Sequence, residues 1–251
     1  LPPAIPAVTS VTVSPNSSDV AKGGNKTFTA SVAGINSPAQ TVTWAVSGNA
    51  EAGTAISSAG VLTVDLSEAA GTPLTITATS TADASKSAVA TVTVEYAIGD
   101  AGPAGGKIFY VDSADTYPLW KYLEAAPADI VGTMMWASSG FTTTPLGGTL
   151  EARGTGKDNT ATILAQDADA PAAKACDDYS LGVFDDWFLP SVGELNEMYS
   201  HRTIIGGFSS DWYWTSSETS ANSARSIDFQ SAALSSLLKY ATRLVRPIRA
   251  F

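Results

Sequence analysis

The stretch Leu74-Thr75-Ile76-Thr77-Ala78-Thr79 alternates apolar and polar side chains at every position. A period of two places successive side chains on opposite faces of an extended strand. Further alternating runs occupy residues 11–13, 27–32, 41–46, 60–64 and 88–94. Because Gly, Asn, Ser and Pro separate these runs, the pattern predicts an all-β sandwich over residues 8–95, with Trp44 as its largest core side chain.

The composition changes close to residue 96. Of the 8 Phe, 6 Trp and 8 Tyr, only Phe28 and Trp44 precede that position. The formal net charge of −10 divides into −3 before residue 96 and −7 from there on. We therefore expect a second domain over residues 96–251. The Pro-rich residues 1–7 are expected to form a flexible tether rather than a signal peptide, because they lack a basic start and an apolar run.

Several classes of function are disfavoured by composition. In 251 residues, 14 Lys and Arg stand against 24 Asp and Glu, which argues against a nucleic-acid partner and against anionic membrane surfaces. No apolar run approaches the roughly 18 residues of a membrane span. With one Cys, Cys176, and one His, His201, the chain can form neither an internal disulfide nor a Cys/His zinc cage.

Acidic pairs raise the question of calcium. Asp177-Asp178 and Asp185-Asp186 are adjacent in sequence, and adjacent carboxylates point in different directions. Calcium needs six to eight oxygen ligands around one point, so we expect no metal and no cofactor. Arg246 and Arg249 are expected to pair with such carboxylates inside the fold.

The second domain combines helix and strand signals. Residues 99–106 are a glycine-rich turn before a strand at 107–111, since they lack the ending of a phosphate loop. Helices are predicted from Asp158 as N-cap to residue 166, from Pro171 to residue 178, and from a capping box of Ser191 and Glu194 to residue 200. Strands are predicted at 212–217, 226–229 and 244–251. This mixture indicates an α+β domain.

Four motifs in the first domain resemble the group 2 bacterial immunoglobulin-like domain. They are residues 11–15 (Val-Thr-Val-Ser-Pro), 22–24 (Lys-Gly-Gly), 42–48 (Val-Thr-Trp-Ala-Val-Ser-Gly) and 60–64 (Gly-Val-Leu-Thr-Val). The resemblance covers residues 8–94. It implies a spacer or adhesive module on a protein outside the cytoplasm.

Six ordered motifs of the second domain resemble the Lcl C-terminal-domain family. They lie at residues 102–110, 122–127, 154–160, 185–196, 213–218 and 245–251. The resemblance implies a C-type-lectin-like domain, similar also to formylglycine-generating enzymes, with a ligand surface on its last strands and connecting loops. Those enzymes use a cysteine pair. Because this chain has only Cys176, we expect a small buried side chain there and no enzyme.

Residues 219–244 carry none of these motifs, although motifs flank them on both sides. This placement resembles the variable proteins of diversity-generating retroelements, which rewrite adenines near the end of a lectin-like gene. An Asn codon AAC changed at its adenines yields Ser, Ala, Leu, Thr, Asp, Arg or Tyr, but not Lys or Gln. Gln230 and Lys239 would then be unchanged scaffold. The alternative is an ordinary Ser/Ala-rich surface loop and strand, and both interpretations stay open.

We therefore expect a non-enzymatic, surface-displayed protein, outside the cytoplasm on a cell or a phage particle, that binds an unknown protein or glycan. Aromatic and small polar side chains suit such a surface. The alternatives are a fixed adhesin for glycan or matrix, a structural surface-layer or phage-fibre module, and an enzyme of the formylglycine-generating type. A sulfated polymer ranks low because the second domain is acidic. The candidate ligand-binding residues are Trp212, Tyr213, Ser220, Arg225, Ser226, Asp228, Ser231, Ala233, Leu234, Ser235, Ser236, Leu237, Leu238, Tyr240, Ala241 and Thr242.

Overall fold

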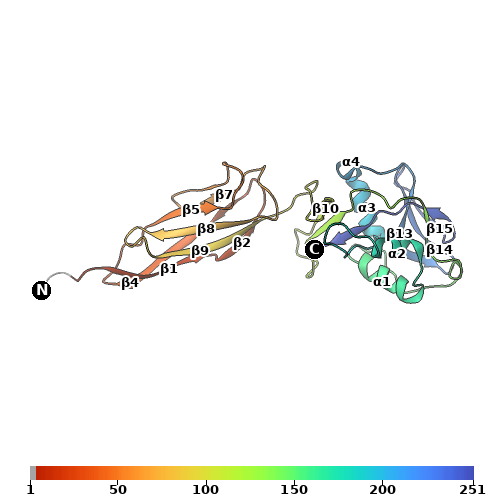
Figure 1. Cartoon of the computed structure of the whole chain (residues 1–251), viewed down its shortest axis with the longest axis horizontal. Helices are drawn as coiled ribbons and strands as arrows, with labels where there is room; N and C mark the ends of the chain where they lie inside the picture. Colours follow the sequence, from red (N-terminus) through yellow and green to blue (C-terminus); the bar gives the residue numbers. More distant parts are fainter. Residues whose placement is uncertain (1–3) are drawn as a thin grey trace. The chain divides into compact units, whose positions relative to one another are not determined.

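The computed structural model of the chain describes residues 4–251 and divides into two compact units, Leu1–Ala97 and Ile98–Phe251 (Figure 1). The division falls two residues beyond the expected one. Glu95 still belongs to the first unit because its N–H donates to the carbonyl oxygen of Val20 at 3.0 Å. The Tyr96 hydroxyl lies against Gly71, where a Cβ would collide with it.

The first unit is built of strands. They are β1 (Ala7–Ser14), β2 (Ser17–Val20), β3 (Asn25–Thr27), β4 (Thr29–Ile35), β5 (Val42–Ser47), β6 (Ala55–Ile56), β7 (Val61–Thr63), β8 (Pro73–Ser80) and β9 (Ser87–Val94). One sheet has the order β2-β9-β8-β5, a second has β3-β7-β6, and β1 pairs with β4. Pairing is antiparallel except between β2 and β9.

The core of the first unit lies between these sheets. Ile76 of β8 and Leu62 of β7 are completely buried and share one apolar cluster with Phe28. Trp44 is only half buried, so the prediction that it is the largest core residue is wrong, and Phe28 takes that place at 1% exposure. The reason is that β5 ends the strand order of its sheet, so the Trp44 ring packs at the margin of the core.

The start of the first unit differs from the expected tether. Residues 1–3 lie outside the described part of the chain. Strand β1 already begins at Ala7, and the Asn36 side-chain amide donates to the Ile5 carbonyl oxygen at 2.8 Å. Residues 5–7 therefore belong to the first unit, because the Asn36 side chain holds Ile5 and strand pairing with Ile35 holds Ala7.

The second unit mixes strands and helices. Its elements are β10 (Lys107–Val111), β11 (Tyr122–Ala125), β12 (Met134–Met135), α1 (Gly156–Gln166), α2 (Pro171–Asp177), α3 (Val192–Ser200), α4 (Arg202–Ile205), β13 (Trp212–Ser220), β14 (Ser223–Asp228), β15 (Leu234–Leu238), β16 (Thr242–Arg243) and β17 (Ile248–Ala250). The sheets have the orders β10-β11-β17 and β13-β14-β15, and β12 pairs with β16.

Of the three helices predicted from the sequence, two begin at the residue that the local signal indicates. Pro171 is the first residue of α2, as predicted. At α3, Ser191 accepts a hydrogen bond from the Glu194 N–H, and the Glu194 carboxylate accepts one from the Ser191 N–H at 2.6 Å, which completes the capping box. The N-cap of α1 is Thr155, so the prediction of Asp158 is wrong. Asp158 lies instead in the first turn, where a carboxylate is favourable.

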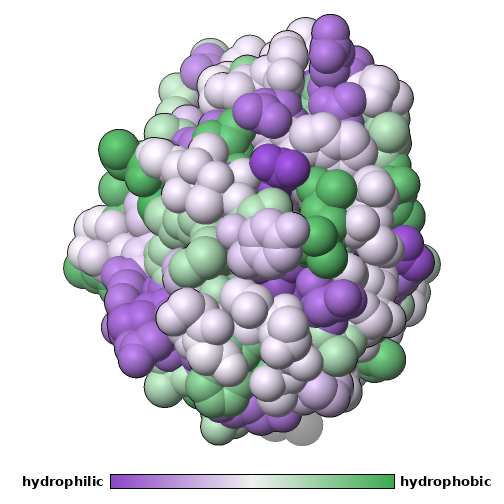
Figure 2. All heavy atoms as spheres, turned by 90° about the vertical axis from the view of Figure 1, so that its right-hand side faces the viewer, coloured by the Kyte–Doolittle hydropathy of each residue, from purple (hydrophilic) through white to green (hydrophobic). Residues whose placement is uncertain are grey.

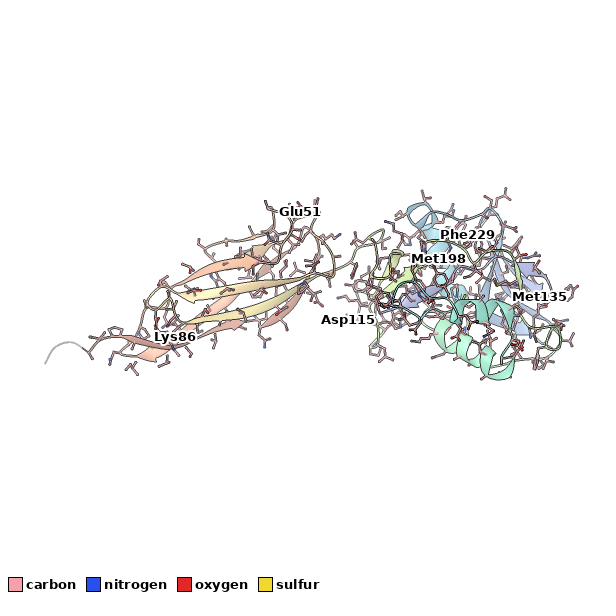
Figure 3. All side chains as sticks on the ribbon, viewed as in Figure 1. Glu51, Lys86, Asp115, Met135, Met198 and Phe229 are labelled. Carbon is pink, nitrogen blue, oxygen red and sulfur yellow. The ribbon has the colours of Figure 1, made fainter. Side chains whose placement is uncertain are left out.

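Strand β13 separates two apolar clusters. Tyr213 packs with Phe109 and Ile248 on one side, whereas Trp214 packs with Trp136 and Cys176 on the other. Tyr213 and Trp214 are both completely buried, because successive side chains of a strand point to opposite faces and both faces are covered here. Met198 of α3 and Phe229 belong to the Tyr213 cluster and lie within the unit (Figure 3).

Candidate ligand-binding surface

The candidate residues lie on the sheet β13-β14-β15, in the turn between β14 and β15, and in the segment from β15 into β16. Antiparallel pairing places Ser223 opposite Leu238, Arg225 opposite Ser236, and Ile227 opposite Leu234. Strand β15 is the last strand in the order of this sheet. The side of the molecule that carries β14 and β15 is mostly of intermediate hydropathy, with small separate apolar and hydrophilic areas (Figure 2).

Exposure alternates strictly from residue 234 to residue 242. The even-numbered side chains are exposed, and the odd-numbered ones are buried or half buried. Leu234, Leu238 and Tyr240 are 43%, 39% and 60% exposed. We call the exposed set the β15 surface: it consists of Leu234, Ser236, Leu238, Tyr240 and Thr242. Ser220, Ser231 and Ala233 are also exposed, at the two turns of the sheet.

Two candidate residues are buried and cannot contact a ligand. Tyr213 is completely buried, and its hydroxyl donates to Asp129 Oδ2 at 2.7 Å. Burial and the bond to Asp129 together raise the pKa of Tyr213. Ser226 is also completely buried, and its hydroxyl donates to the Tyr213 carbonyl oxygen at 2.8 Å. The prediction is wrong at both positions because packed side chains cover both faces of the sheet here: Tyr213 shares one face with Ile227, and Ser226 shares the other with Trp214. The sequence pattern does not reveal that cover.

Four further candidates are half buried. Leu237 and Ala241 pack against the cluster that contains Trp214, so their side chains support the fold. Trp212 and Ser235 are partly accessible. Leu237 and Ala241 therefore help to hold the strand, whereas Trp212 and Ser235 keep part of their side chains available for contact.

Arg225 is held by neighbours on the surface. Its Nε lies 2.7 Å from Glu151 Oε1, and its guanidinium also donates to the Ser236 hydroxyl at 3.0 Å. The arginine is thus fixed in place beside β15. A ligand that approached the guanidinium would have to compete with Glu151.

Asp228 shapes the turn between β14 and β15. Its carboxylate accepts hydrogen bonds from the Gln230 N–H at 3.0 Å and from the Ser231 hydroxyl at 2.5 Å. The hydrogen bond from Ser231 is the main cause that lowers the pKa of Asp228. The Gln230 side chain itself is exposed, so only its backbone takes part in the scaffold.

Lys239 lies between the exposed residues Leu238 and Tyr240 in the sequence, yet its side chain is completely buried. Its ammonium group forms an ion pair with Glu218 and donates to the Thr144 carbonyl oxygen at 2.8 Å. Glu218 also accepts the N–H groups of Leu146 and Gly147 at 2.8 and 2.7 Å. The role expected for Lys239 as scaffold agrees with this geometry.

The two C-terminal arginines form buried ion pairs with carboxylates. Arg249 binds both carboxylate oxygens of Asp186, at 2.7 and 3.0 Å, and also Glu124 at 3.1 Å. Arg246 pairs with Asp129 at 2.6 Å, a carboxylate that lies 117 residues away in sequence. The prediction that carboxylates of the acidic pairs bind these arginines is confirmed for Arg249 with Asp186 and is wrong for Arg246, whose partner is Asp129. Asp129 and Glu124 carry no local signal that would single them out.

The nucleophilic and metal-binding residue types are dispersed. Cys176 is completely buried in the Trp214 cluster, and burial raises the pKa of its thiol well above the usual value. His201 caps the end of α3, with Nδ1 3.1 Å from the Glu197 carbonyl oxygen. Within residues 4–251, no three His, Cys, Asp or Glu side chains gather closely enough to hold a metal ion. None of the helices in that range is long and apolar enough to cross a membrane.

A pocket that the sequence did not indicate lies elsewhere in the second unit. It encloses about 170 Å³ and shares no residue with the β15 surface. Its lining combines Trp120 and Phe188 with charged side chains.

No protein-family model matches the chain, and no curated protein sequence does. Among solved structures, a fimbrial protein from Bacteroides ovatus is similar over 96% of this chain and 71% of its own length, with 14% identity and a TM-score of 0.45. Invasin, a bacterial integrin-binding protein, is similar over 98% of this chain and 40% of its own length, with 11% identity and a TM-score of 0.22. Both TM-scores lie below 0.5, so neither likeness identifies a shared fold.

Proposed function

We propose that this chain is a surface-displayed, non-enzymatic binding protein. The first unit serves as an immunoglobulin-like spacer, and the second is a C-type-lectin-like domain whose β15 surface contacts a protein or glycan ligand outside the cytoplasm. One observation carries the proposal: exposure alternates without interruption from Leu234 to Thr242. Every second side chain supports the fold, and the side chains between them are left for contact.

The chemistry of the β15 surface suits recognition. Leu234, Leu238 and Tyr240 offer apolar and aromatic area, while Ser236 and Thr242 offer hydroxyl groups that donate and accept. Tyrosine is a rigid contact residue with few rotatable bonds, so little conformational entropy is lost when it binds. The buried Lys239–Glu218 pair and the half-buried Leu237 hold the strand in place beneath this surface. A preorganised surface of this kind favours binding.

The same alternation supports diversification of this surface. All five residues of the β15 surface can be reached from an Asn codon AAC by changes at adenine, whereas the buried Lys239 cannot. Substitution at the five exposed positions would alter contacts without altering the core. Ser226 can also be reached from AAC, but its burial excludes it from a set of positions that vary freely.

The binding proposal is tested by a designed loss of the surface. The purified full chain is screened on arrays of glycans and of extracellular proteins, beside a variant carrying Leu234→Ser, Leu238→Ser and Tyr240→Ser. A matched control carries Val131→Ser, Leu150→Ser and Val183→Ser, which are 97%, 60% and 89% exposed elsewhere on the second unit. We expect the unmodified chain to bind at least one array component. The first variant should lose that signal, and the control should keep it. Signals that survive in the first variant, or none for the unmodified chain, would contradict the proposal.

Diversification has a separate test in the DNA. We expect a near-repeat of the codons for residues 213–251 downstream of the gene, beside a gene for a reverse transcriptase. The two copies should differ only at adenines of the repeat, at codons of the β15 surface and not at the codons of Ser226 or Lys239. Differences spread over all bases would argue for an ordinary surface loop.

A further inference from the structure

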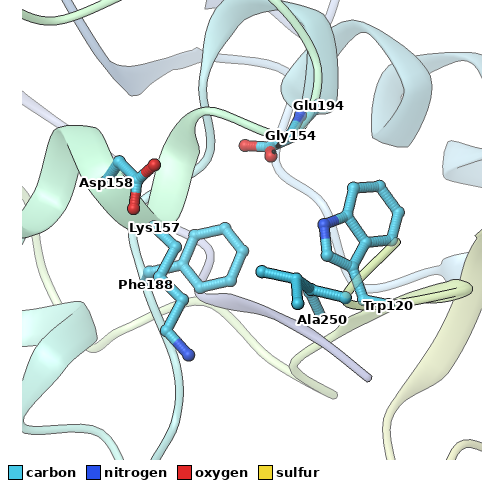
Figure 4. A pocket seen from close by; sticks show the side chains of 8 residues that line it. Trp120, Gly154, Lys157, Asp158, Phe188, Glu194 and Ala250 are labelled. Atoms are coloured by element: carbon cyan, nitrogen blue, oxygen red, sulfur yellow. Dashed lines mark hydrogen bonds between the residues drawn. The ribbon is translucent and has the colours of Figure 1, made fainter. Parts of the chain in front are cut away.

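A pocket of about 170 Å³ lies in the second unit, apart from the β15 surface. A pocket of this volume has room for several water molecules or one small organic ring. Its lining residues are Leu119, Trp120, Gly154, Lys157, Asp158, Phe188, Glu194 and Ala250. They come from four segments that are distant in sequence (Figure 4).

The apolar part of the pocket is rigid. The Phe188 ring is 3% exposed and forms one wall together with Ala250 of β17. The Trp120 indole is stacked on the Tyr117 ring, with centroids 4.1 Å apart and planes at 14°. Tyr110 meets the same indole edge to face at 6.0 Å. Because two aromatic rings support the indole, the wall is formed before any ligand arrives.

Gly154 keeps this wall in place. Its φ of +88° lies in the region that side chains rarely adopt. A Cβ at this position would lie 2.6 Å from Tyr117 Cε1 and 3.4 Å from Trp120 Cζ2. Only glycine therefore allows the backbone to approach the stacked pair this closely.

Polar groups surround the apolar walls. The nitrogen edge of the Trp120 indole faces the pocket, and the Glu194 carboxylate lies across from Phe188 (Figure 4). That carboxylate is completely buried and accepts hydrogen bonds from the N–H groups of Gly154, Gly156 and Ser191, at 2.9, 3.3 and 2.6 Å. Burial raises its pKa. Lys157 and Asp158, in the first turn of α1, are exposed at the rim.

This combination selects a class of ligand. The lining offers N–H donors from Trp120 and Lys157 and an exposed carboxylate acceptor from Asp158, around an apolar wall. A hydroxyl group both donates and accepts, so a polyhydroxylated ring matches all three groups at once. With two carboxyl groups against one ammonium group, the lining does not favour an anion. A few convergent polar groups on an otherwise apolar lining are typical of small-molecule sites.

We propose that this pocket binds one neutral sugar ring, such as the terminal unit of a glycan. The ring packs its C–H face against Phe188 and Ala250. Its hydroxyl groups bind Asp158 and the Trp120 indole N–H. The site uses none of the residues of the β15 surface, so it stands or falls independently of the ligand proposed there.

The experiment titrates the full chain with single sugars. Glucose, galactose, mannose, fucose and the two N-acetylhexosamines are followed by saturation-transfer NMR, with chemical shifts of the Trp120 indole N–H as a site-specific signal. We expect one or more of these sugars to bind and to shift that signal. Asp158→Ala removes an exposed acceptor, and Ala250→Leu fills the pocket.

Asp158→Ala should weaken sugar binding about tenfold or more, since a hydrogen bond to a charged group contributes on that scale. Ala250→Leu should weaken it as well, because the larger side chain occupies the space of the ring. Asp169→Ala is the matched control, because Asp169 is exposed on the same unit but outside the pocket. It should leave binding unchanged, as should Leu238→Ser. Unchanged thermal unfolding of each variant shows that the fold persists. The proposal would be overturned if no sugar bound, or if Asp158→Ala and Ala250→Leu both bound sugar as tightly as the unmodified chain.

Discussion

Lys239 forms a buried ion pair with Glu218 although its neighbours Leu238 and Tyr240 face solvent. The pair joins the residue after β15 to the end of β13. Hydrogen bonds from Leu146 and Gly147 to Glu218 attach a third segment. This buried ion pair therefore anchors the exposed surface of the sheet from beneath, together with the packing of Leu237 and Ala241.

Replacing that lysine is expected to destabilise the second unit. Lys239→Met leaves the buried Glu218 carboxylate without its counter-charge, which costs about 3–5 kcal/mol for pairs of this kind. Urea unfolding followed by tryptophan fluorescence measures the change. Lys174→Met is the control, because Lys174 and Asp178 form an exposed pair with side chains 45% and 59% accessible, and little change is expected. Equal stability of the two variants would show that the buried pair has no special role.

Replacing Ser226 or Ser236 by a large side chain is expected to have very different effects on stability. Ser226→Tyr forces a large ring into a filled core and removes the hydrogen bond to the Tyr213 carbonyl oxygen, at a cost of about 2–3 kcal/mol. Ser236→Tyr places the same ring on the exposed side of β15, where surface substitutions change stability by about 0.5 kcal/mol or less. Melting temperatures compare the two. A stable Ser226→Tyr protein would mean that the inner face of β14 can open.

Acid is expected to weaken the Asp186–Arg249 pair. Burial by itself would raise the pKa of Asp186, but the hydrogen bonds and charge of Arg249 lower it below its ordinary 3.8. The folded state then binds fewer protons than the unfolded state, so this stabilisation is present above pH 3.8 and is lost as the pH falls through the lowered pKa. Asp186→Asn should lower the melting temperature at neutral pH and flatten its decline in acid. Asp169→Asn, which alters an exposed carboxylate, should do neither.

Cys176 is expected to be unreactive in the folded protein. The thiolate is the reactive form, and burial raises the pKa of this thiol well above its usual value. Ellman's reagent at mildly alkaline pH should therefore label the protein only after urea unfolds it. Labelling of the native protein at the rate of a free peptide thiol would contradict the buried position.

Local signals in the sequence were sufficient to predict structure where the interacting residues are close along the chain. Ser191 and Glu194 are three residues apart, and their capping box forms as predicted. Pro171 begins α2 because its fixed φ suits a first helical position. Alternation likewise predicted the strand at Leu74–Thr79, since a period of two is a property of the backbone alone.

Local patterns in the sequence predicted most strands of the first unit, three helices of the second and the two faces of the alternating strands, but not α4 or β11. Which of those faces are covered depends on long-range packing. Tyr213 and Trp214 are both buried because clusters pack on either side of β13, whereas β15 is covered on one side and exposes Leu234, Leu238 and Tyr240 on the other. The partners of Arg246 and the four segments of the pocket lie far apart in sequence, so only long-range packing brings them together.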